Sequence, residues 1–355
     1  MTRRALLVSD AATGDGRWAR LARTAGWYAD LGFEIAALRL GEANPGAPAV
    51  RRWREALRAE IACARPDAAP AALARLDDAA AFDVIHLDAP SAPPWIAAGR
   101  RGFRVAERPA ALAAEGALPG WAEHVDAFLA VVPDDEAAIE TTGRPGFAAA
   151  FLGRFAPRPA PLRRRRAPGP RLAGLWLDGD EGPQAAAAAL LDAVRRRGGG
   201  APPRFLIGGP AAASLDPPPL PHPAVVVDAP RAARVFHRGL DLSLFPEAGG
   251  VDERRRACGP RVDLLEALEA GATPIASSAA LHGLGRFWRL PRFDDLEAFA
   301  EYLFERGRDL RDGGLSAELR ARADWTWAGL RDASATQGAA LAAAIRERLR
   351  EKAPR

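Results

Sequence analysis

The chain has 355 residues, 48% of them hydrophobic, and a formal net charge of +4. Because single cores stop growing beyond ~250–300 residues, this length predicts about two domains. Cys63 and Cys258 are too few for a disulfide framework, and no run approaches the ~20 apolar residues of a membrane span, so we expect a cytoplasmic protein. The basic residues are scattered apart from Arg163 to Arg166, which argues against a nucleic-acid partner.

The first elements predict a nucleotide-binding type of α/β unit. An apolar run at residues 5–8 predicts a strand, and a polar, glycine-bearing stretch follows at 9–16. A helix should come next, since apolar residues recur on one face from Trp18 to Tyr28, and Gly32 is suited to end it. Residues 33–38 predict the second strand. The order strand, glycine loop, helix, strand is typical of a doubly wound sheet.

The rest of the first half continues this alternation. Residues from about 50 to 81 are rich in alanine and predict helix. Apolar runs predict strands at 82–87, 103–106 and 127–132. Acidic residues just after Pro133 favour the start of a helix, because they complement the helix dipole.

Prolines surround four consecutive arginines at residues 156–170, so this segment cannot be a helix interior or a central strand. We interpret it as a linker between domains. The predicted organisation is an N-terminal domain at 1–155, the linker at 156–170, a C-terminal domain at 171–330, and a final helix at 331–355 that could cross back to the N-terminal domain.

The second half repeats the α/β pattern. Apolar runs predict strands at 171–177, 204–207, 225–227, 242–245 and 273–276. Helices are expected from Pro183, placed at the N1 position, to Gly198, over 262–270, and from 294 onward. The last helix, 340–355, alternates apolar and basic residues, which suits packing on the N-terminal domain or contact with an anionic membrane surface.

One segment resembles a known family. Residues 259–275, GPRVDLLEALEAGATPI, are similar to the donor-site helix of group 1, family-four-like glycosyltransferases. Weaker similarities occur at 82–86, 127–134, 240–246 and 277–284. The resemblance implies the GT-B architecture: two Rossmann-like doubly wound domains with the ligand in an interdomain cleft. It also implies transfer of a sugar from a nucleotide-sugar donor, retaining and metal-independent, in a bacterial protein without a cofactor.

The resemblance assigns roles in donor binding. Glu266 would accept the ribose hydroxyls, and Arg261 would pair with a phosphate. Asp263 stands where the family has a phosphate-binding lysine, and the loop at 178–181 is acidic. These departures favour an alternative, a catalytically inactive GT-B-like binding or scaffolding protein; an epimerase of similar architecture is a third option. The remaining predicted donor-binding residues are Glu247, His282, Gly208 and Gly209.

Candidates in the N-terminal half rest on their position after strands. Gly14, Asp15 and Gly16 could form an acceptor or phosphate loop, or simply a tight turn. His86 and Asp88 end a strand where catalytic groups of α/β folds collect, and Asp88 is the better candidate base. His86 has the alternative of a buried core histidine. His124, His222 and His237 have no partner at a useful spacing and are interpreted as structural or surface residues.

The expected partners follow from the same resemblance. They are a nucleotide-sugar donor and an acceptor of unknown type, which could be a glycan, a lipid or a protein. Peripheral contact with the inner face of the membrane would suit the basic last helix. No spacing of histidine, cysteine or acidic residues predicts a metal site.

Overall fold

The computed structural model describes the chain except residues 1, 12–15, 42–43, 45, 89–101, 108, 115, 117, 132, 148–151, 154, 156–171, 178–180, 199–202, 218, 221–223, 227–232, 239, 248–260, 310–313 and 352–355. It divides into two compact units. Unit 1 comprises Met1–Arg154, Ala257–Gly259 and Asp332–Arg355, and unit 2 comprises Phe155–Arg256 and Pro260–Arg331. The predicted linker lies outside the described residues.

Unit 1 begins with the predicted βαβ unit. Strand β1 (Arg3–Ser9) leads into helix α1 (Gly16–Asp30), and strand β2 (Phe33–Leu40) returns parallel to β1. Gly32, with a φ of 87°, makes the turn between α1 and β2 in a left-handed conformation that favours glycine. This part of the sequence prediction is confirmed.

The continuous helix predicted from 50 to 81 is wrong. The structure has helix α2 (Pro48–Leu57), strand β3 (Glu60–Ala64), the short 3-10 helix η1 (Pro66–Ala68) and helix α3 (Ala69–Ala80). β3 pairs in parallel with β2 at the edge of the sheet, and this pairing outweighs the helix propensity of its alanines.

The remaining strands complete a seven-stranded parallel sheet in the order β3-β2-β1-β4-β5-β6-β7. They are β4 (Val84–Asp88), β5 (Phe103–Glu107), β6 (Ala127–Leu129) and the unpredicted β7 (Gly146–Phe147). Between them lie α4 (Pro109–Ala114), α5 (Leu118–Ala122) and α6 (Pro133–Glu140).

Two hydrophobic cores cover the two faces of this sheet. One packs α1 and α2 against residues such as Leu7 and Val105, and the other packs α3 and α5 against residues such as Leu6 and Ile85. Leu341 and Ile345, from the last helix α12 (Gly314–Glu351), belong to the first core. The apolar side of this terminal segment therefore packs within unit 1.

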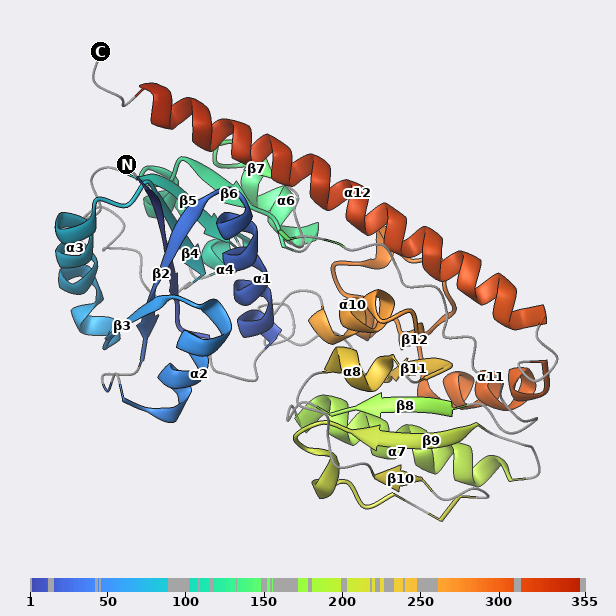
Figure 1. Ribbon diagram of the computed structural model, residues 1–355. Coiled ribbons are helices and arrows are strands. Elements are labelled where there is room, and N and C mark those ends of the chain that lie inside the picture. The colour runs from blue at the N-terminus through green and yellow to red at the C-terminus, as the bar shows by residue number, and fades with distance from the viewer. Residues whose placement is uncertain are drawn as a thin grey trace. The chain divides into compact units, whose positions relative to one another are not determined.

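Unit 2 contains a six-stranded parallel sheet in the order β10-β9-β8-β11-β12-β13. Its strands are β8 (Leu172–Trp176), β9 (Arg204–Gly208), β10 (Val225–Val226), β11 (Leu242–Phe245), β12 (Thr273–Ser277) and β13 (Arg292–Phe293). Figure 1 shows β8, β9 and β10 side by side in this sheet.

The helices of unit 2 pack in pairs. Helix α7 (Glu181–Arg197) contacts α11 (Leu296–Asp309), and α8 (Ala233–His237) contacts α10 (Val262–Glu269). Helix α7 begins two residues before Pro183, so this proline occupies the third helical position and not the predicted first. The described part of this unit also contains the 3-10 helices η3 (Ala212–Ser214), η4 (Ala279–Leu281) and η5 (Gly285–Phe287).

Both sheets have the strand order of a doubly wound Rossmann-like domain, so the predicted fold class is confirmed. In such sheets the strand order reverses at one point, and ligands bind outside the carboxyl ends of the strands there. The reversal lies between β1 and β4 in unit 1 and between β8 and β11 in unit 2. Within the described part of the chain, no helix combines the length and the apolar run that crossing a bilayer requires.

Candidate functional site

A buried polar network lies at the strand reversal of unit 1. Ser9 ends β1 and Asp88 ends β4, and the two residues are paired in the register of these strands. The Ser9 hydroxyl donates to Asp88 Oδ2 over 3.0 Å. Both side chains are almost fully buried, so this contact fixes the Asp88 carboxylate at the carboxyl edge of the sheet.

An arginine from α1 joins Asp88 to the next strand. Arg20 Nε donates to Glu107 Oε2 over 2.9 Å, and Arg20 Nη2 lies 3.4 Å from Asp88 Oδ1. Burial by itself lowers the pKa of Arg20, but the carboxylates of Glu107 and Asp88 outweigh it, and the pKa lies above its ordinary value. Arg20 therefore stays charged and acts as the buried counter-ion of two carboxylates.

His86 extends the network toward α1. Its Nε2 lies 2.8 Å from Glu107 Oε1 and its Nδ1 lies 3.0 Å from the Tyr28 hydroxyl. Burial, followed by the charge of Glu107, raises the pKa of Tyr28, so the hydroxyl keeps its proton and can donate it. Since an ionised carboxylate only accepts hydrogen bonds, His86 carries its proton on Nε2 and accepts from Tyr28 at Nδ1.

Arg17 connects this network to the surface. It lies in the first turn of α1, pairs with Asp10, and donates from Nη2 to the Asp88 backbone carbonyl over 2.6 Å. Its side chain is 12% exposed, whereas those of Arg20 and Asp88 are 2% exposed. We call Ser9, Arg17, Arg20, Tyr28, His86, Asp88 and Glu107 the unit 1 polar network.

The structure brings His86 and Asp88 into one network, as partners of Glu107 and Arg20. Both side chains are buried and hydrogen bonded, which favours a positioning role for them. Their predicted catalytic roles stay predictions. The arginines on α1 were not predicted to be site residues, although Arg17, Arg20 and Thr24 follow helical spacing toward Tyr28 and form a polar stripe.

The strand reversal of unit 2 has a different chemistry. His237, at the end of α8, is 1% exposed, and its Nδ1 lies 2.9 Å from the Ser243 hydroxyl of β11. Its Nε2 is buried and has no hydrogen-bond partner in the described part of the chain. The rings of Trp176 and Phe245 lie against the imidazole.

Burial lowers the pKa of His237 to about 4, with Asp263 opposing this shift and Arg261 adding to it. His237 is therefore a neutral imidazole near pH 7 and supplies no positive charge to a phosphate. It was predicted to be a structural or surface residue; the structure places it in the interior.

The two charged residues at the start of α10 pair with each other. Arg261, at the N-cap, donates from Nε to Asp263 Oδ1 over 3.0 Å, and its Nη2 also contacts Asp263. The Arg261 guanidinium lies over the Phe245 ring at 5.2 Å. Asp263, which stands where the family has a lysine, thus pairs with Arg261, the arginine that the resemblance assigns to a donor phosphate.

The other predicted donor residues are spread over the same unit. Glu266 is the fifth residue of α10 and partly buried, so it lies in the middle of the helix. Glu247 follows β11 and is partly buried, with Oε2 in the interior. His282 follows η4 and is also partly buried. Their donor contacts stay predictions.

Gly208 and Gly209, at the end of β9, have packing reasons for lacking a side chain. A Cβ on Gly208 would lie 2.6 Å from Phe236 Cε2, and Gly209 has a φ of 109° with the Leu177 backbone against it. Gly16 is the first residue of α1, while Gly14, Asp15 and the acidic residues 178–180 lie outside the described residues.

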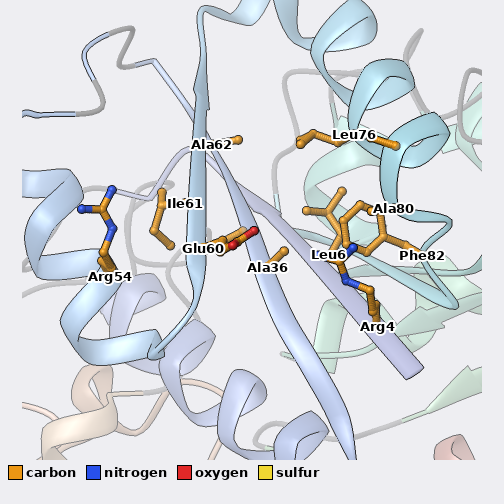
Figure 2. A pocket seen from close by; sticks show the side chains of 12 residues that line it. Arg4, Leu6, Ala36, Arg54, Glu60, Ile61, Ala62, Leu76, Ala80 and Phe82 are labelled. Atoms are coloured by element: carbon orange, nitrogen blue, oxygen red, sulfur yellow. The ribbon is translucent and has the colours of Figure 1, made fainter. Parts of the chain in front are cut away.

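One cavity of about 490 Å³ lies elsewhere in unit 1, toward the amino ends of β1 and β3. Figure 2 shows Arg4 and Phe82 together near β1, with Arg54 across β3 from them. The Arg4 guanidinium lies over the Phe82 ring at 5.2 Å. Because ligands of doubly wound sheets bind at the carboxyl ends, this cavity is separate from the strand-reversal sites.

Comparison with known proteins gives structural matches alone. No family model and no curated protein matches the sequence. HepE from Anabaena, solved in complex with UDP-glucose, has a TM-score of 0.62 at 12% identity, covering 96% of this chain and 99% of its own. A glycosyltransferase from Rickettsia africae has a TM-score of 0.64 at 10% identity, covering 100% of both chains.

Sucrose-phosphate synthase from Thermosynechococcus elongatus has a TM-score of 0.61 at 10% identity, covering 99% of this chain and 100% of its own. These proteins are GT-B glycosyltransferases. At such identities the similarity establishes the fold alone. The chain therefore has the GT-B fold, as its donor-like segment predicted.

Proposed function

We propose that this protein is a glycosyltransferase that moves a sugar from a nucleotide-sugar donor to an acceptor. The observation that carries the proposal is the GT-B fold, shared over nearly the whole of both chains with HepE, which was solved with UDP-glucose. Fold similarity alone does not assign chemistry, so the residues at the two strand reversals carry the rest of the proposal.

In this proposal unit 2 binds the donor. Its residues 259–275 resemble the donor-site helix, and Glu266, Arg261, Glu247 and His282 are the proposed contacts. The reaction would be retaining and metal-independent, with the positive charge of arginine in place of a metal ion at the leaving diphosphate. Nucleotide-sugar would be a co-substrate, with no resident cofactor.

Unit 1 would bind the acceptor beside the polar network. Proton transfer by Asp88 would require its contacts with Ser9 and Arg20 to loosen, since both carboxylate oxygens are engaged. We therefore propose that Asp88 and His86 chiefly position Arg17 at the start of α1. Removal of Asp88 should then lower turnover through misplacement of Arg17.

One observation favours the alternative of an inactive binding protein. Arg261 is 5% exposed and already paired with Asp263, so a donor phosphate has to compete with a buried carboxylate for this arginine. An enzyme of this design would bind its donor less tightly than one with a free arginine. A binding protein would not turn the donor over at all.

The experiment that separates these options measures donor binding and donor hydrolysis in the same preparation. Purified protein is titrated with UDP-, GDP-, ADP- and TDP-sugars, with thermal unfolding and nucleotide release as readouts. A glycosyltransferase should be stabilised by one donor class and release its nucleotide slowly without an acceptor, with and without EDTA. Binding without release in the presence of candidate acceptors supports an inactive binding protein. No binding to any donor contradicts the glycosyltransferase and supports a scaffolding protein.

Two substitutions test the donor residues. Glu266→Ala should weaken donor binding by roughly 10- to 100-fold, because charge-assisted hydrogen bonds to ribose are lost. Asp263→Asn should tighten it by releasing Arg261 for the phosphate. Glu297→Ala, an exposed acidic residue on α11, is the matched control and should leave binding unchanged. Equal affinities in all variants would contradict the assigned donor site.

We further propose a cytoplasmic protein with peripheral contact to the inner membrane surface. The arginines Arg346, Arg348 and Arg350 of α12 are exposed, while the apolar residues of the same segment pack in unit 1. Contact would therefore be electrostatic and sensitive to salt. Flotation with anionic vesicles at low and high salt tests this, and an equal absence of binding at both would contradict it.

A further inference from the structure

Arg39 is a charged side chain at the carboxyl edge of unit 1 that the polar network does not use. It is the second-last residue of β2, paired in register with Ser9 on one side and with Cys63 on the other. It lies on the sheet face covered by α1 and α2. This edge is where ligands of doubly wound sheets bind.

The guanidinium of Arg39 has no hydrogen-bond acceptor in the described part of the chain. Its Nε and Nη1 are buried without a hydrogen-bond partner, although the side chain as a whole is partly exposed. Buried unsatisfied donors are rare in folded proteins and each one calls for an explanation. A buried donor on a charged group is especially unfavourable, because burial removes its hydration without replacing it.

Within the described residues, the Arg39 guanidinium lies over an aromatic ring. It lies 5.7 Å from the centroid of Trp53, a fully buried residue of α2. Trp18 of α1 stacks on Trp53 with ring centroids 4.7 Å apart and fixes its position. Trp53 Nε1 is also buried without a hydrogen-bond acceptor. Arg39 and Trp53 therefore present N–H donors to which no oxygen atom of the described residues is bonded.

A ring contact holds Arg39 more weakly than an anion would. Cation–π contacts at partly exposed sites are worth less than charge-assisted hydrogen bonds to a carboxylate or a phosphate. Turning the guanidinium toward an anion breaks no hydrogen bond within the described residues. The planar fork of arginine can then engage two oxygens at once, which lysine cannot do.

We propose that Arg39 binds an anionic group, a carboxylate or a phosphate, carried by the acceptor. The assignment of this anion to the sugar acceptor rests on the proposed glycosyltransferase function. The anion site itself rests on Arg39 and Trp53, whose buried N–H groups have no hydrogen-bond partner within the described residues. The protein would thus select an acidic acceptor over a neutral one. Trp18 and Trp53 are positioning residues, which keep the resting guanidinium at the edge of the sheet.

The test uses the full chain and three probes: methyl glucuronide, inorganic phosphate and neutral methyl glucoside, each against sodium chloride of equal ionic strength. Wild type should be stabilised against heat by at least one of the two anions and not by the glucoside. Stabilisation by the glucuronide alone points to a carboxylate, and by phosphate alone to a phosphate. No effect beyond that of sodium chloride, or an equal effect of the glucoside, would overturn the proposal.

Arg39→Met keeps the apolar stem and removes the charge. It should abolish the anion effect and raise the midpoint of the unliganded protein by about 2 °C, because two buried N–H donors without a hydrogen-bond partner are lost. A structural arginine would behave oppositely, with a lower midpoint and an unchanged anion effect. Arg52→Met, at an exposed position on α2, makes the same change of charge and should alter neither readout.

Arg39→Lys keeps the positive charge and removes the fork, so it also covers the case in which Arg39→Met fails to fold. It should weaken anion binding by about 10-fold or more and leave UDP-sugar binding unchanged. Equal anion affinity in this variant and wild type would overturn the proposal. An anion effect that needs Arg39 in a protein that binds no nucleotide-sugar would refute the proposed function while leaving the anion site in place.

Discussion

The strand reversals of the two units have the same topology and opposite chemistry. In unit 1 the reversal is filled by a buried chain of charged and polar side chains, centred on Arg20 and Glu107. In unit 2 it is lined by aromatic rings around the neutral His237, with Arg261 and Asp263 paired beside them. The strand order sets where a site can form, and the side chains at the strand ends decide what it can bind.

This difference also separates two ways of holding an arginine. Arg20 is fixed by two carboxylates in a network with several members. Arg261 pairs with the carboxylate of Asp263, two residues away, and lies over the face of Phe245. We therefore expect unit 1 to lose stability when one member of its network is removed, and unit 2 to change its ligand binding more readily than its fold.

The largest effect should come from Glu107→Ala. The Glu107 carboxylate accepts from His86 over 2.8 Å and from Arg20 over 2.9 Å, and it is 4% exposed. Removing one partner of a buried pair leaves an uncompensated charge, so we expect a loss of about 3–5 kcal/mol in the free energy of unfolding. Chemical denaturation measures the loss, and hydrogen exchange should show it in β4 and β5.

Ser243→Ala is the counterpart in unit 2. It removes the hydrogen bond to His237 and should cost about 1–3 kcal/mol, since the imidazole keeps a buried unpaired nitrogen. Glu34→Ala, at an exposed ion pair with Arg4, is the control and should change stability little. Equal losses for Glu107→Ala and Ser243→Ala would remove the contrast between the two reversals.

The second effect is a dependence on pH that His237 introduces. Its pKa of about 4 in the folded protein lies below the ordinary value of 6.5, so the unfolded chain binds the extra proton first. The stability contributed by neutral His237 is complete above pH 6.5 and is lost as pH falls toward 4. The loss should reach about 3 kcal/mol over this window.

His237→Gln supplies the comparison, because glutamine does not titrate. Unfolding free energies of wild type and variant, measured by denaturation from pH 7 to pH 4.5, should converge as the pH falls. Parallel curves over this range would show that His237 is charged or exposed in the native state. Asp263 and Arg261 face the imidazole with opposite charges, so Asp263→Asn should lower its pKa further.

The sequence allowed the α/β alternation and the fold class to be predicted, because buried parallel strands leave apolar runs between helices. It also identified Asp88 and His86 as residues at a strand end. Their partners Arg20 and Glu107 were missed, since nothing local shows that residues 87 positions apart will form an ion pair. The pairing of Arg261 with Asp263 was also not predicted, although these residues are only two positions apart.

The third effect concerns the packing at the end of β9. Gly208→Ala places a Cβ 2.6 Å from Phe236 Cε2, so we expect a loss of about 1–3 kcal/mol from overpacking. Gly120→Ala, in α5 with open space around the new methyl, should be neutral or stabilising. If Gly208 also contacts the donor, UDP-sugar affinity should fall more than the stability loss explains; calorimetric unfolding and titration together separate the two roles.

The smallest effect comes from the ends of helices, where α2 and α3 of unit 1 differ from two helices of unit 2. Helices α7 and α10 of unit 2 are followed by left-handed glycines, Gly198 and Gly271. Helices α2 and α3 of unit 1 instead end in Arg58 and Ala81, with φ values of 50° and 46°. No glycine marks these ends in the sequence. One helix was therefore predicted in place of α2 and α3, and β3 between them was not predicted.

A residue with a Cβ is strained in the left-handed conformation, so Ala81→Gly should raise the free energy of unfolding by about 0.5–1 kcal/mol. The gain is small because glycine also increases the conformational entropy of the unfolded chain. Ala79→Gly, the same change at an exposed position inside α3, should lower stability by a similar amount, because glycine is unfavourable within a helix. Urea denaturation of both variants beside wild type measures the two signs. A loss of stability in both variants would mean that Ala81 adopts its left-handed conformation without strain. The helix ends of the two units would then differ in the residue that occupies them and not in backbone strain.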